Sequence, residues 1–526
     1  MELKEYQQRA LNQVKRYMEA LSVWREKSLK SSELDLGEID FPAKAWEACE
    51  INWYNYISRK NGLGEHLPIF CLKIPTGGGK TLLAVKAIDL VNQIYLKKQT
   101  GLVLWIVPTT QIYRQTLQSL KDRSHPYRQY LDIASGGKTL VLEKNSHFSR
   151  IDVEENLAVL MLMLPSANRK NKEALKVFKD NGFMEFFPSE DDIEGQRKVL
   201  DLVPNLDTFG DETGFWGRQI KTSLGNTLRI LKPLIILDEG HKAYSENAQA
   251  TLRTFNPSMI VELSATPPKE SNILIDIPGM DLLREEMIKL DLHITNKASY
   301  DWKETLLASV NHLNVLDKKA KEYDANSGNY IRPICVIQAE RTGKDQIAPN
   351  VIHSESVKEY LIKNIGIPEQ EIAIKTSEKD ELKDVDNLTQ DGLLGRACPI
   401  RFIITKHALQ EGWDCPFAYV LTILTNPTSQ NALTQLVGRI LRQPYAKKTG
   451  VKELDESYIF CFQQRASDLL FNVKSGFEKE GLGDLAGKVV TDGSFEGEGV
   501  SDRINEVREK FKDIAKGVIL PFFAIK

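Results

Sequence analysis

Residues 69–90 read IFCLKIPTGGGKTLLAVKAIDL, which joins an apolar run, a glycine-rich turn and a helical pattern. The apolar run Ile69–Ile74 is short and continuous, which is typical of a buried strand in a parallel sheet. The turn PTGGGKT follows directly, and its glycines allow backbone N–H groups to curl around phosphate oxygens. The N-terminus of the helix that begins there adds a positive dipole. The stretch predicts a P-loop, in which Lys80 reaches the β- and γ-phosphates and the Thr81 hydroxyl holds Mg²⁺.

One position departs from the general P-loop pattern, because Ile74 replaces its first glycine. A tight strand-to-helix turn that is merely rich in glycine is the alternative. The order of strand, loop, Lys-Thr pair and helix favours the phosphate site. The predicted nucleotide-binding residues of the turn are Thr76, Gly77, Gly78, Gly79, Lys80 and Thr81.

The succession of an apolar run and a polar turn recurs along the chain. It is found at Leu102–Val107 before PTT, at Leu234–Leu237 before DEGH and at Met259–Leu263 before SATP. Further runs lie at Ile334–Gln338, Arg401–Thr405 and Tyr419–Leu424. Because helical patterns alternate with these runs, we predict parallel strands covered on both faces, an α/β architecture. Functional turns are then expected at the carboxyl ends of the strands.

Two adjacent carboxylates follow the run Leu234–Leu237, in the sequence DEGH at 238–241. P-loop hydrolysis needs such a pair at the end of a buried strand. We expect Asp238 to coordinate Mg²⁺ through water and Glu239 to orient and deprotonate the attacking water. Alone, such a pair is usually a solvated turn; the upstream P-loop favours the catalytic role.

Composition excludes several other classes of protein. With 42% hydrophobic and 27% charged residues, the 526-residue chain can bury ordinary cores and is not disordered overall. A net charge of −3 argues against a uniformly basic nucleic-acid coat, although not against a basic groove. The six cysteines have no metal-ligand spacing and indicate reduced thiols. There is no signal-peptide pattern, and the most apolar run, Leu157–Leu164, is too short to span a bilayer, so we expect a soluble cytoplasmic protein.

Four further motifs, together with the P-loop and DEGH, resemble those of superfamily 2 helicases and translocases, in the order of that superfamily. Ser264-Ala265-Thr266-Pro267 resembles motif III, which couples the nucleotide site to movement, and QEGWD at 410–414 resembles motif V. QLVGRILR at 435–442 matches the Q-x-x-G-R-x-x-R pattern of motif VI, and Tyr6-Gln7 before Ala10-Leu11 resembles the adenine-reading Q element. Within the superfamily, EGWDCP, LVGRILRQP and the later NVKSGFEKEGLGDLAG are most similar to the ATPase (Res) subunit of type III restriction enzymes.

The resemblance implies two RecA-like parallel-sheet domains with an ATP cleft between them, plus insertions and a short C-terminal extension. We expect the first domain at residues 1–295, with an elaboration around 125–230. The second domain is expected at 296–465 and the C-terminal extension at 466–526.

The resemblance also implies roles for individual residues. The predicted catalytic residues are Lys80, Asp238, Glu239, Arg439 and Arg442, the two arginines acting as arginine fingers on the γ-phosphoryl group. Further predicted nucleotide-binding residues are Gln7, Gly412 and Asp414, and the predicted Mg²⁺ ligands are Thr81 and Asp238. The predicted coupling residues are His241, Ser264, Thr266 and Gln435. At the place of motif Ia, the residues expected to contact nucleic-acid phosphates are Thr109, Thr110 and Arg114.

Some of these roles have structural alternatives. Arg439 and Arg442 could be surface arginines, and His241 could simply be packed. Trp413 is interpreted as a core residue, with base stacking as the alternative. A hydroxyl often precedes the motif V glycine by six residues, whereas Lys406 stands there, so we assign no strand contact at that position.

The motifs together predict an enzyme: an ATP-dependent nucleic-acid motor, either a helicase or a double-stranded DNA translocase, in restriction or phage defence. ATP and Mg²⁺ are the expected cofactors. The expected partner is DNA, duplex rather than single strand, and a separate nuclease or a methyltransferase/specificity subunit is a candidate partner. An RNA helicase and an ATP-switched scaffold that recruits a separate effector are the alternatives. The tail has no PD…(D/E)xK arrangement, and Glu381-Leu382-Lys383 lies in a highly charged segment, so we expect no nuclease domain in this chain.

Overall fold

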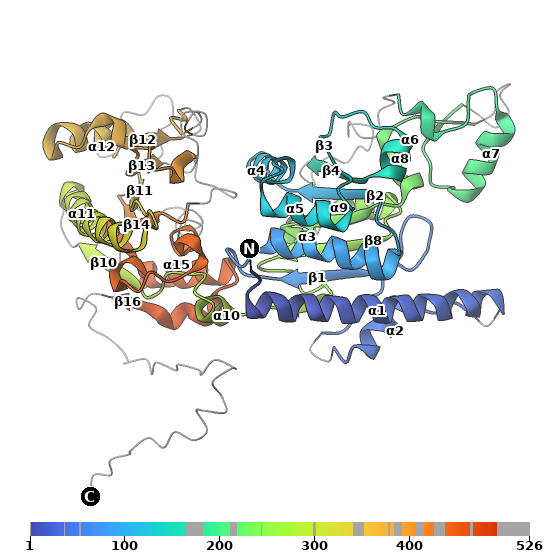
Figure 1. The fold of residues 1–526 in the computed structure, drawn as a ribbon, viewed down its shortest axis with the longest axis horizontal. Coiled ribbons are helices and arrows are strands. Elements are labelled where there is room, and N and C mark those ends of the chain that lie inside the picture. Colours follow the sequence, from blue (N-terminus) through green and yellow to red (C-terminus); the bar gives the residue numbers. More distant parts are fainter. Residues whose placement is uncertain are drawn as a thin grey trace, which may run out of the picture. The chain divides into compact units, whose positions relative to one another are not determined.

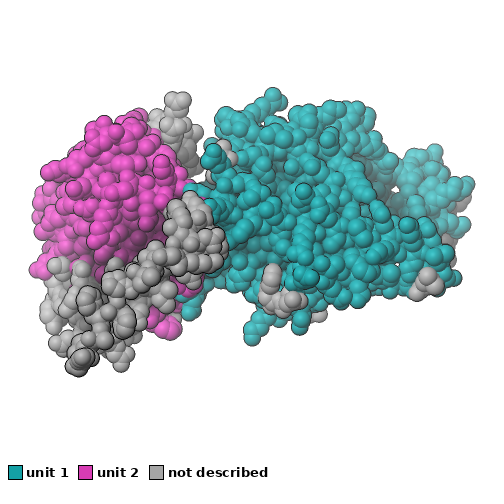
Figure 2. Space-filling view, turned by 60° about the horizontal axis from the view of Figure 1, so that its bottom comes forward, with its two compact units in different colours: residues 1–278, 409–414, 476–483 teal, residues 279–408, 415–475, 484–526 magenta. Residues whose placement is uncertain are grey.

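Two compact units make up the fold in a computed structural model of the chain (Figures 1 and 2). The first comprises residues 1–278, 409–414 and 476–483, and the second comprises residues 279–408, 415–475 and 484–526. The structure describes residues 2–35, 37–51, 54–163, 182–210, 218–243, 245–297, 301–339, 352–376, 379–382, 385, 392–405, 415–424, 437–462 and 466–491.

The first unit is built on a parallel sheet that has seven strands among the described residues. Their order across the sheet is β3-β4-β2-β7-β8-β1-β9. The strands are β1 (Ile69–Lys73), β2 (Gly101–Val107), β3 (Thr139–Leu142), β4 (Leu157–Met163), β7 (Leu234–Asp238), β8 (Met259–Ser264) and β9 (Ile273–Asp276). Because β8 lies between β7 and β1, the turns that follow these three strands meet at one edge of the sheet.

Helix α1 (Glu5–Glu33) and helix α2 (Phe41–Ala48) lie side by side in this unit (Figure 1). The buried face of α1 repeats every three or four residues, as at Tyr6, Ala10, Val14 and Tyr17, which is the period of an amphipathic helix. The ring of Tyr17 packs edge-on against two further aromatic rings, Trp46 of α2 and Phe70 of β1. The middle of α1 is therefore packed against the sheet.

The remaining helices of the first unit follow the strands. They are α3 (Lys80–Leu90), α4 (Thr110–Lys121), α5 (Pro126–Ala134), α6 (Arg150–Glu155), α7 (Ile193–Leu202), α8 (Leu224–Leu231) and α9 (Glu246–Thr254). A short antiparallel pair, β5 (Thr208–Phe209) and β6 (Gln219–Ile220), lies between α7 and α8.

The region around 125–230 extends the first sheet, because its strands β3 and β4 add to the β2 side. Its aromatic side chains Phe148, Phe183 and Phe186 belong to the same buried cluster as Leu104 of β2. This region shares the main core of the unit, and Leu157–Met163 is an interior strand of the sheet.

The second unit has a parallel sheet of its own, with the order β12-β13-β11-β14-β15-β10-β16 among the described residues. The strands are β10 (Leu292–Lys297), β11 (Ile334–Gln338), β12 (Ile372–Lys375), β13 (Phe402–Thr405), β14 (Ala418–Ile423), β15 (Ser457–Phe462) and β16 (Val489–Thr491). The helices are α10 (Gly279–Arg284), α11 (Trp302–Ser327), α12 (Ser354–Tyr360) and the first part of α15 (Ala466–Lys479), whose residues from Gly476 onward belong to the first unit.

All seven apolar runs that the sequence predicts to be strands form strands of these two sheets. The predicted α/β architecture with two RecA-like parallel-sheet domains is confirmed. The first and longest segment of the first unit ends at Pro278, and the expected domain boundary at 295/296 falls inside β10. β10 belongs to the second sheet because it pairs with β15 and β16. None of the helices in the described ranges combines the length and apolarity that a bilayer-spanning helix needs.

Candidate functional site

The predicted P-loop joins β1 to α3 as a tight turn. Its first residue, Ile74, donates its N–H to the carbonyl of Ser264, and Gly78 donates to the carbonyl of Pro75 (3.0 Å). Gly77 and Gly79 have φ angles of 85° and 83°, a left-handed backbone that glycine adopts without strain. Helix α3 begins immediately afterwards, so its first backbone N–H groups lie at the loop. This is the geometry that an anion-binding turn requires.

The N-terminus of α1 contacts the same loop. The hydroxyl of Tyr6 donates a hydrogen bond to the carbonyl of Gly78 (2.9 Å), and Nε2 of Gln7 lies 3.4 Å from that carbonyl. A Cβ on Gly79 would lie 2.7 Å from Nε2 of Gln7, so any other residue there would displace the Gln7 amide. Oε1 of Gln7 accepts a hydrogen bond from the backbone of Lys4, which caps the helix. The predicted adenine-reading residue Gln7 is buried, and in this structure its amide braces the loop.

The two predicted acidic residues lie at the end of β7. Asp238 is the last residue of the strand, and its Oδ1 accepts a hydrogen bond from the backbone N–H of Glu239 (3.0 Å). Glu239 has a φ of 49°, a strained conformation for this residue type. Its Oε1 lies 2.6 Å from Nζ of Lys80, so the loop lysine and the second carboxylate form an ion pair.

The charges of Lys80, Asp238 and Glu239 shift one another's pKa values. Burial and the charge of Glu239 raise the pKa of Asp238 to about 6, even though Lys80 opposes the shift. Burial opposes ionisation of Glu239, but the ammonium of Lys80 holds its pKa below the usual value. Burial likewise disfavours the ammonium of Lys80, yet the carboxylates of Glu239 and Asp238 raise its pKa. The pair is therefore charged at neutral pH.

A chain of polar contacts links the carboxylate of Glu239 to the end of β8 and the turn that follows it. Nδ1 of His241 lies 3.5 Å from Oε2 of Glu239 and 3.1 Å from Oγ of Ser264. The same Oγ accepts a hydrogen bond from the backbone N–H of Thr266 (3.2 Å). The structure thus brings together Lys80, Glu239, His241, Ser264 and Thr266, which the sequence predicts as catalytic or coupling residues.

A late segment of the sequence also contacts the loop. The backbone N–H of Thr76 donates a hydrogen bond to the carbonyl of Glu480 (3.0 Å). Gly481 packs against Pro75 and Ala265. The sequence analysis missed both Glu480 and Gly481 as site residues. The one available signal was the resemblance of NVKSGFEKEGLGDLAG to a region that follows motif VI.

The predicted motif Ia residues lie at the start of α4. Thr109 caps the helix, because its hydroxyl accepts a hydrogen bond from the N–H of Ile112 (3.4 Å). Thr110 and Arg114 lie on the exposed face of the same helix. No contact within the described residues assigns a function to these side chains.

The predicted arginines belong to the second unit. Arg439 is buried in a short helical segment, and Arg442 forms an isolated bridge with Ile288. Gln443 donates to the carbonyl of Met287, which continues this pairing. Three predicted site residues, Gly412, Asp414 and Gln435, lie outside the described residues, as do Lys406 and Trp413.

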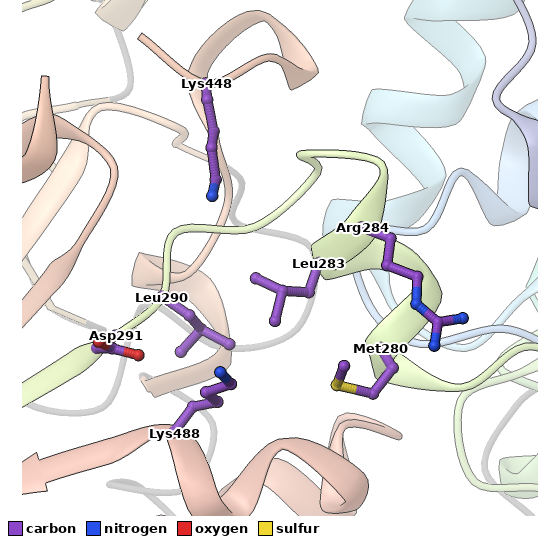
Figure 3. A pocket seen from close by; sticks show the side chains of 7 residues that line it. All are labelled: Met280, Leu283, Arg284, Leu290, Asp291, Lys448 and Lys488. Carbon is purple, nitrogen blue, oxygen red and sulfur yellow. The ribbon is translucent and has the colours of Figure 1, made fainter. Parts of the chain in front are cut away.

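The second unit also has a small cavity of about 200 Å³ at the amino ends of β10 and β16 (Figure 3). Figure 3 shows the ammonium groups of Lys448 and Lys488 pointing into it from opposite walls, with Leu283 and Leu290 between them. The cavity is lined as well by Arg284 and Asp291. It lies at the sheet edge opposite the one where the carboxyl ends of the strands meet.

The predicted Mg²⁺ ligands offer two oxygen donors. They are the hydroxyl of Thr81 on the first turn of α3 and the carboxylate of Asp238. Mg²⁺ commonly takes one or two protein oxygens and completes its octahedron with water and substrate phosphates, so this donor set fits the ion. Among the described residues, no cluster of three His, Cys, Asp or Glu side chains could hold a metal by itself.

Comparison with protein families identifies the chain. The model of the family "Type III restriction enzyme, res subunit" matches residues 1–269, about half of the sequence. The chain belongs to this family. The matched residues of this res-family chain include the P-loop, the DEGH sequence and Ser264–Thr266. No curated protein matches the sequence.

Several solved structures are similar to this res-family chain at low identity. The ATP-dependent type ISP restriction-modification enzyme LlaBIII bound to DNA is 12% identical, with a TM-score of 0.43, over 91% of this chain and 30% of that chain. S. cerevisiae Dbp5 bound to RNA and ADP BeF3 is 13% identical, with a TM-score of 0.35, over 81% of this chain and 85% of that chain. Mycobacterium smegmatis helicase Lhr bound to ssDNA and AMP-PNP is 15% identical, with a TM-score of 0.40, over 84% of this chain and 48% of that chain. The chain therefore spans less than a third of the LlaBIII chain.

Proposed function

We propose that this res-family chain is an ATP-dependent nucleic-acid motor that hydrolyses ATP to ADP and phosphate, with duplex DNA as its track. One observation carries the proposal. The strand ends of β1, β7 and β8 bring the P-loop lysine, two carboxylates and the His241–Ser264 pair into one connected group. Membership of the res family supports a role in restriction or defence.

The P-loop supplies the ground-state binding of the triphosphate. Backbone N–H groups of Gly77–Thr81 and the ammonium of Lys80 are the proposed partners of the β- and γ-phosphates. Thr81 and Asp238 are the proposed Mg²⁺ ligands, and the bound ion neutralises charge on the phosphate oxygens. Deprotonated Asp238 is required for that role, and its carboxyl group is ionised above pH 6.

Glu239 is the proposed general base. In this structure it is paired with Lys80, which keeps the pKa of its carboxyl group low and makes it a weak base. Phosphate oxygens that bind the ammonium of Lys80 would replace Glu239 as its partner. The pKa of Glu239 would then rise towards the range useful for proton transfer. The ion pair thus couples activation of the base to occupancy of the P-loop.

His241 and Ser264 are the proposed coupling residues. His241 contacts both the carboxylate of Glu239 and the hydroxyl of Ser264, which in turn orients the backbone of Thr266. A shift of Glu239 on nucleotide binding would therefore reach the turn after β8 through two hydrogen bonds. Arg439 and Arg442 are the proposed groups that stabilise charge on the transferred phosphoryl group.

A steady-state ATPase assay with a panel of nucleic acids tests this function. We expect duplex DNA to stimulate hydrolysis more than single-stranded DNA or RNA, with an effect that weakens as salt rises. Lys80→Ala should abolish hydrolysis and weaken nucleotide binding, because it removes the charge opposite the β- and γ-phosphates. Lys86→Ala is the matched control, since Lys86 lies on the same helix but contacts the ring of Tyr130.

The possible results separate the candidate functions. Stimulation by RNA alone would favour an RNA helicase. Nucleotide binding without stimulated hydrolysis would favour an ATP-switched scaffold. Wild-type turnover in Lys80→Ala would disprove the P-loop assignment itself.

A further inference from the structure

The C-terminal end of α15 forms a Schellman turn. The N–H of Leu482 donates to the carbonyl of Phe477, and the N–H of Gly481 donates to the carbonyl of Glu478. Gly481 has a φ of 74°, and the side chains of Leu482 and Phe477 are both almost fully buried. These are the paired hydrogen bonds, the left-handed residue and the apolar contact of the motif. The path of the chain after the helix is therefore closely defined.

This turn leaves one helix-end carbonyl free to contact the P-loop. The last carbonyls of a helix have no partner within it, and a buried carbonyl needs one elsewhere. The carbonyl of Glu480 accepts its hydrogen bond from the backbone N–H of Thr76 (3.0 Å). The contact uses backbone atoms on both sides, so no side-chain pattern in the sequence reports it.

Gly481 lies too close to the site for any side chain. A Cβ at this position would lie 2.8 Å from the carbonyl oxygen of Ala265 and 3.3 Å from Cα of Pro75. These neighbours are backbone atoms of the two turns that follow β8 and β1. The turn after α15 thus fits between the start of the P-loop and the Ser264–Thr266 turn.

The two halves of the P-loop are braced by different parts of the chain. Tyr6 of α1 holds the carbonyl of Gly78 in the second half, and the carbonyl of Glu480 holds the amide of Thr76 in the first half. A loop that is held at both halves keeps its remaining N–H groups in position before a ligand arrives. Such preorganisation strengthens the binding of the phosphates.

We infer that residues 476–483, which we name the α15 clamp, are a positioning element of the nucleotide site, holding Thr76 and Ala265 through backbone contacts. The inference rests on the proposed nucleotide-binding function and adds an element from outside the helicase motifs to it. Gly481 is a positioning residue here, because it acts through the P-loop and need not contact the nucleotide.

Two glycine-to-alanine variants provide the test. Gly481→Ala adds a Cβ against Ala265 and Pro75. Gly328→Ala is its matched control, because Gly328 also ends a helix, has a φ of 73° and has no atom within 4 Å of an added Cβ. Both substitutions impose the same left-handed strain on alanine, but only the first pushes on the P-loop.

Binding of a fluorescent ADP analogue and hydrogen exchange at the Thr76 amide are the two measurements. We expect Gly481→Ala to weaken ADP binding about tenfold, as expected when a binding loop is misplaced. Its Thr76 amide should exchange faster than in the wild type, because the amide loses the carbonyl of Glu480. Gly328→Ala should leave both the ADP affinity and the exchange rate of Thr76 as in the wild type.

The inference would be overturned if Gly481→Ala and Gly328→Ala had the same ADP affinity and the same exchange rate at the Thr76 amide. If the wild type itself binds no nucleotide, the proposed function fails, while Thr76 exchange still tests the contact. If Gly481→Ala does not fold, Leu482→Ala replaces it, because that change removes the apolar contact of the turn without adding an atom near Ala265. The same two measurements on Leu482→Ala then decide the outcome.

Discussion

At the residue scale, the contact that matters most to the proposed mechanism is the 2.6 Å pair between Lys80 and Glu239. The two residues are 159 positions apart, and each is predicted to have a different task on the nucleotide. Their pairing gives each of two partly buried charges an opposite charge, which a lone charge in this place would lack. The pair therefore has a structural consequence, and the proposed mechanism gives it a catalytic one as well.

Replacement of Glu239 by glutamine tests its role as the base. Glu239→Gln should slow ATP hydrolysis by about 10²–10⁴-fold, because an amide cannot take a proton from water. Binding of ATP and Mg²⁺ should persist, since Asp238 and the P-loop remain. Single-turnover hydrolysis and nucleotide titration measure the two effects. Should Glu239→Gln lose Mg²⁺ binding while Asp238→Asn keeps it, the two roles would have to be exchanged.

Lys289 shows a second kind of buried charge, in the second unit. Its side chain is fully buried, with Nζ donating to the carbonyls of Pro416 (2.9 Å) and Ala418 (2.7 Å) and lying over the ring of Tyr419. Burial lowers its pKa well below the ordinary value of 10.5. A lowered pKa in the folded state means that the unfolded chain binds the proton more strongly. The contribution of Lys289 to stability is therefore most favourable above pH 10.5 and becomes less favourable as the pH decreases towards its folded-state pKa.

Urea unfolding of the wild type and of Lys289→Met between pH 7 and pH 10.5 checks the direction of this pH dependence. We expect the wild type to lose stability relative to Lys289→Met as the pH falls, because methionine has no proton to take up. Lys319→Met, which changes a half-exposed lysine of α11, is the control and should show no such trend. A stability difference that does not vary with pH would mean that Lys289 stays charged in the fold.

At the element scale, α1 connects the hydrophobic core to the P-loop. Its middle residues, such as Tyr17 and Met18, are completely buried, while Tyr6 and Gln7 at its start contact Gly78. Because the helix is rigid over this length, packing at Tyr17 positions the hydroxyl of Tyr6. The helix therefore transmits the order of the core to the nucleotide site.

Two tyrosine-to-phenylalanine variants separate these roles of α1. Tyr6→Phe removes the hydrogen bond to Gly78 and should weaken nucleotide binding several-fold, with a loss of about 1 kcal/mol in the free energy of unfolding. Tyr17→Phe changes the same helix, α1, and removes a hydrogen bond from Tyr17 to the carbonyl of Pro42 in α2; it should change stability alone. Nucleotide titration and chemical denaturation of both variants measure the difference. Equal nucleotide affinities would show that the α1 contact does not shape the loop.

At the scale of the whole molecule, each unit has its own parallel sheet, and the proposed catalytic groups are divided between the units. Lys80, Asp238 and Glu239 belong to the first unit, while Arg439 and Arg442 belong to the second. Interactions that form only as charge develops on the phosphoryl group raise turnover without strengthening ground-state binding. This division predicts that binding and hydrolysis can be separated by mutation.

Arg442→Ala tests that separation. We expect nucleotide affinity and duplex-DNA affinity close to those of the wild type, with turnover reduced by about 10³-fold or more, as in other P-loop enzymes that lose an arginine finger. Arg396→Ala is the control, since Arg396 is exposed and paired with Asp324 in the same unit. If turnover stays normal and DNA binding is lost, Arg442 belongs to the nucleic-acid surface.

Local signals in the sequence were sufficient to predict much of this fold. Continuous apolar runs predicted seven of the strands, because a buried parallel strand must be apolar on both faces. The P-loop and DEGH turns could be predicted for a related reason. Each is a short stretch of consecutive residues whose types are determined by local backbone geometry and chemistry. The sequence analysis did not predict the strand β10, because its alternating sequence LHITNK is not a continuous apolar run and does not show which sheet it joins.

By itself, the sequence determined the α/β class, the order of the motifs and the membership of a P-loop family, since each depends on neighbouring residues. Only the tertiary structure decided which residues brace the loop. Tyr6 reaches Gly78 across 72 positions, and Glu480 reaches Thr76 across most of the chain. The second of these contacts joins a backbone carbonyl to a backbone amide, which every residue type except proline can supply at the donor end. Such a contact leaves no residue pattern to read, and it exists only because the packing of the unit brings the two segments together.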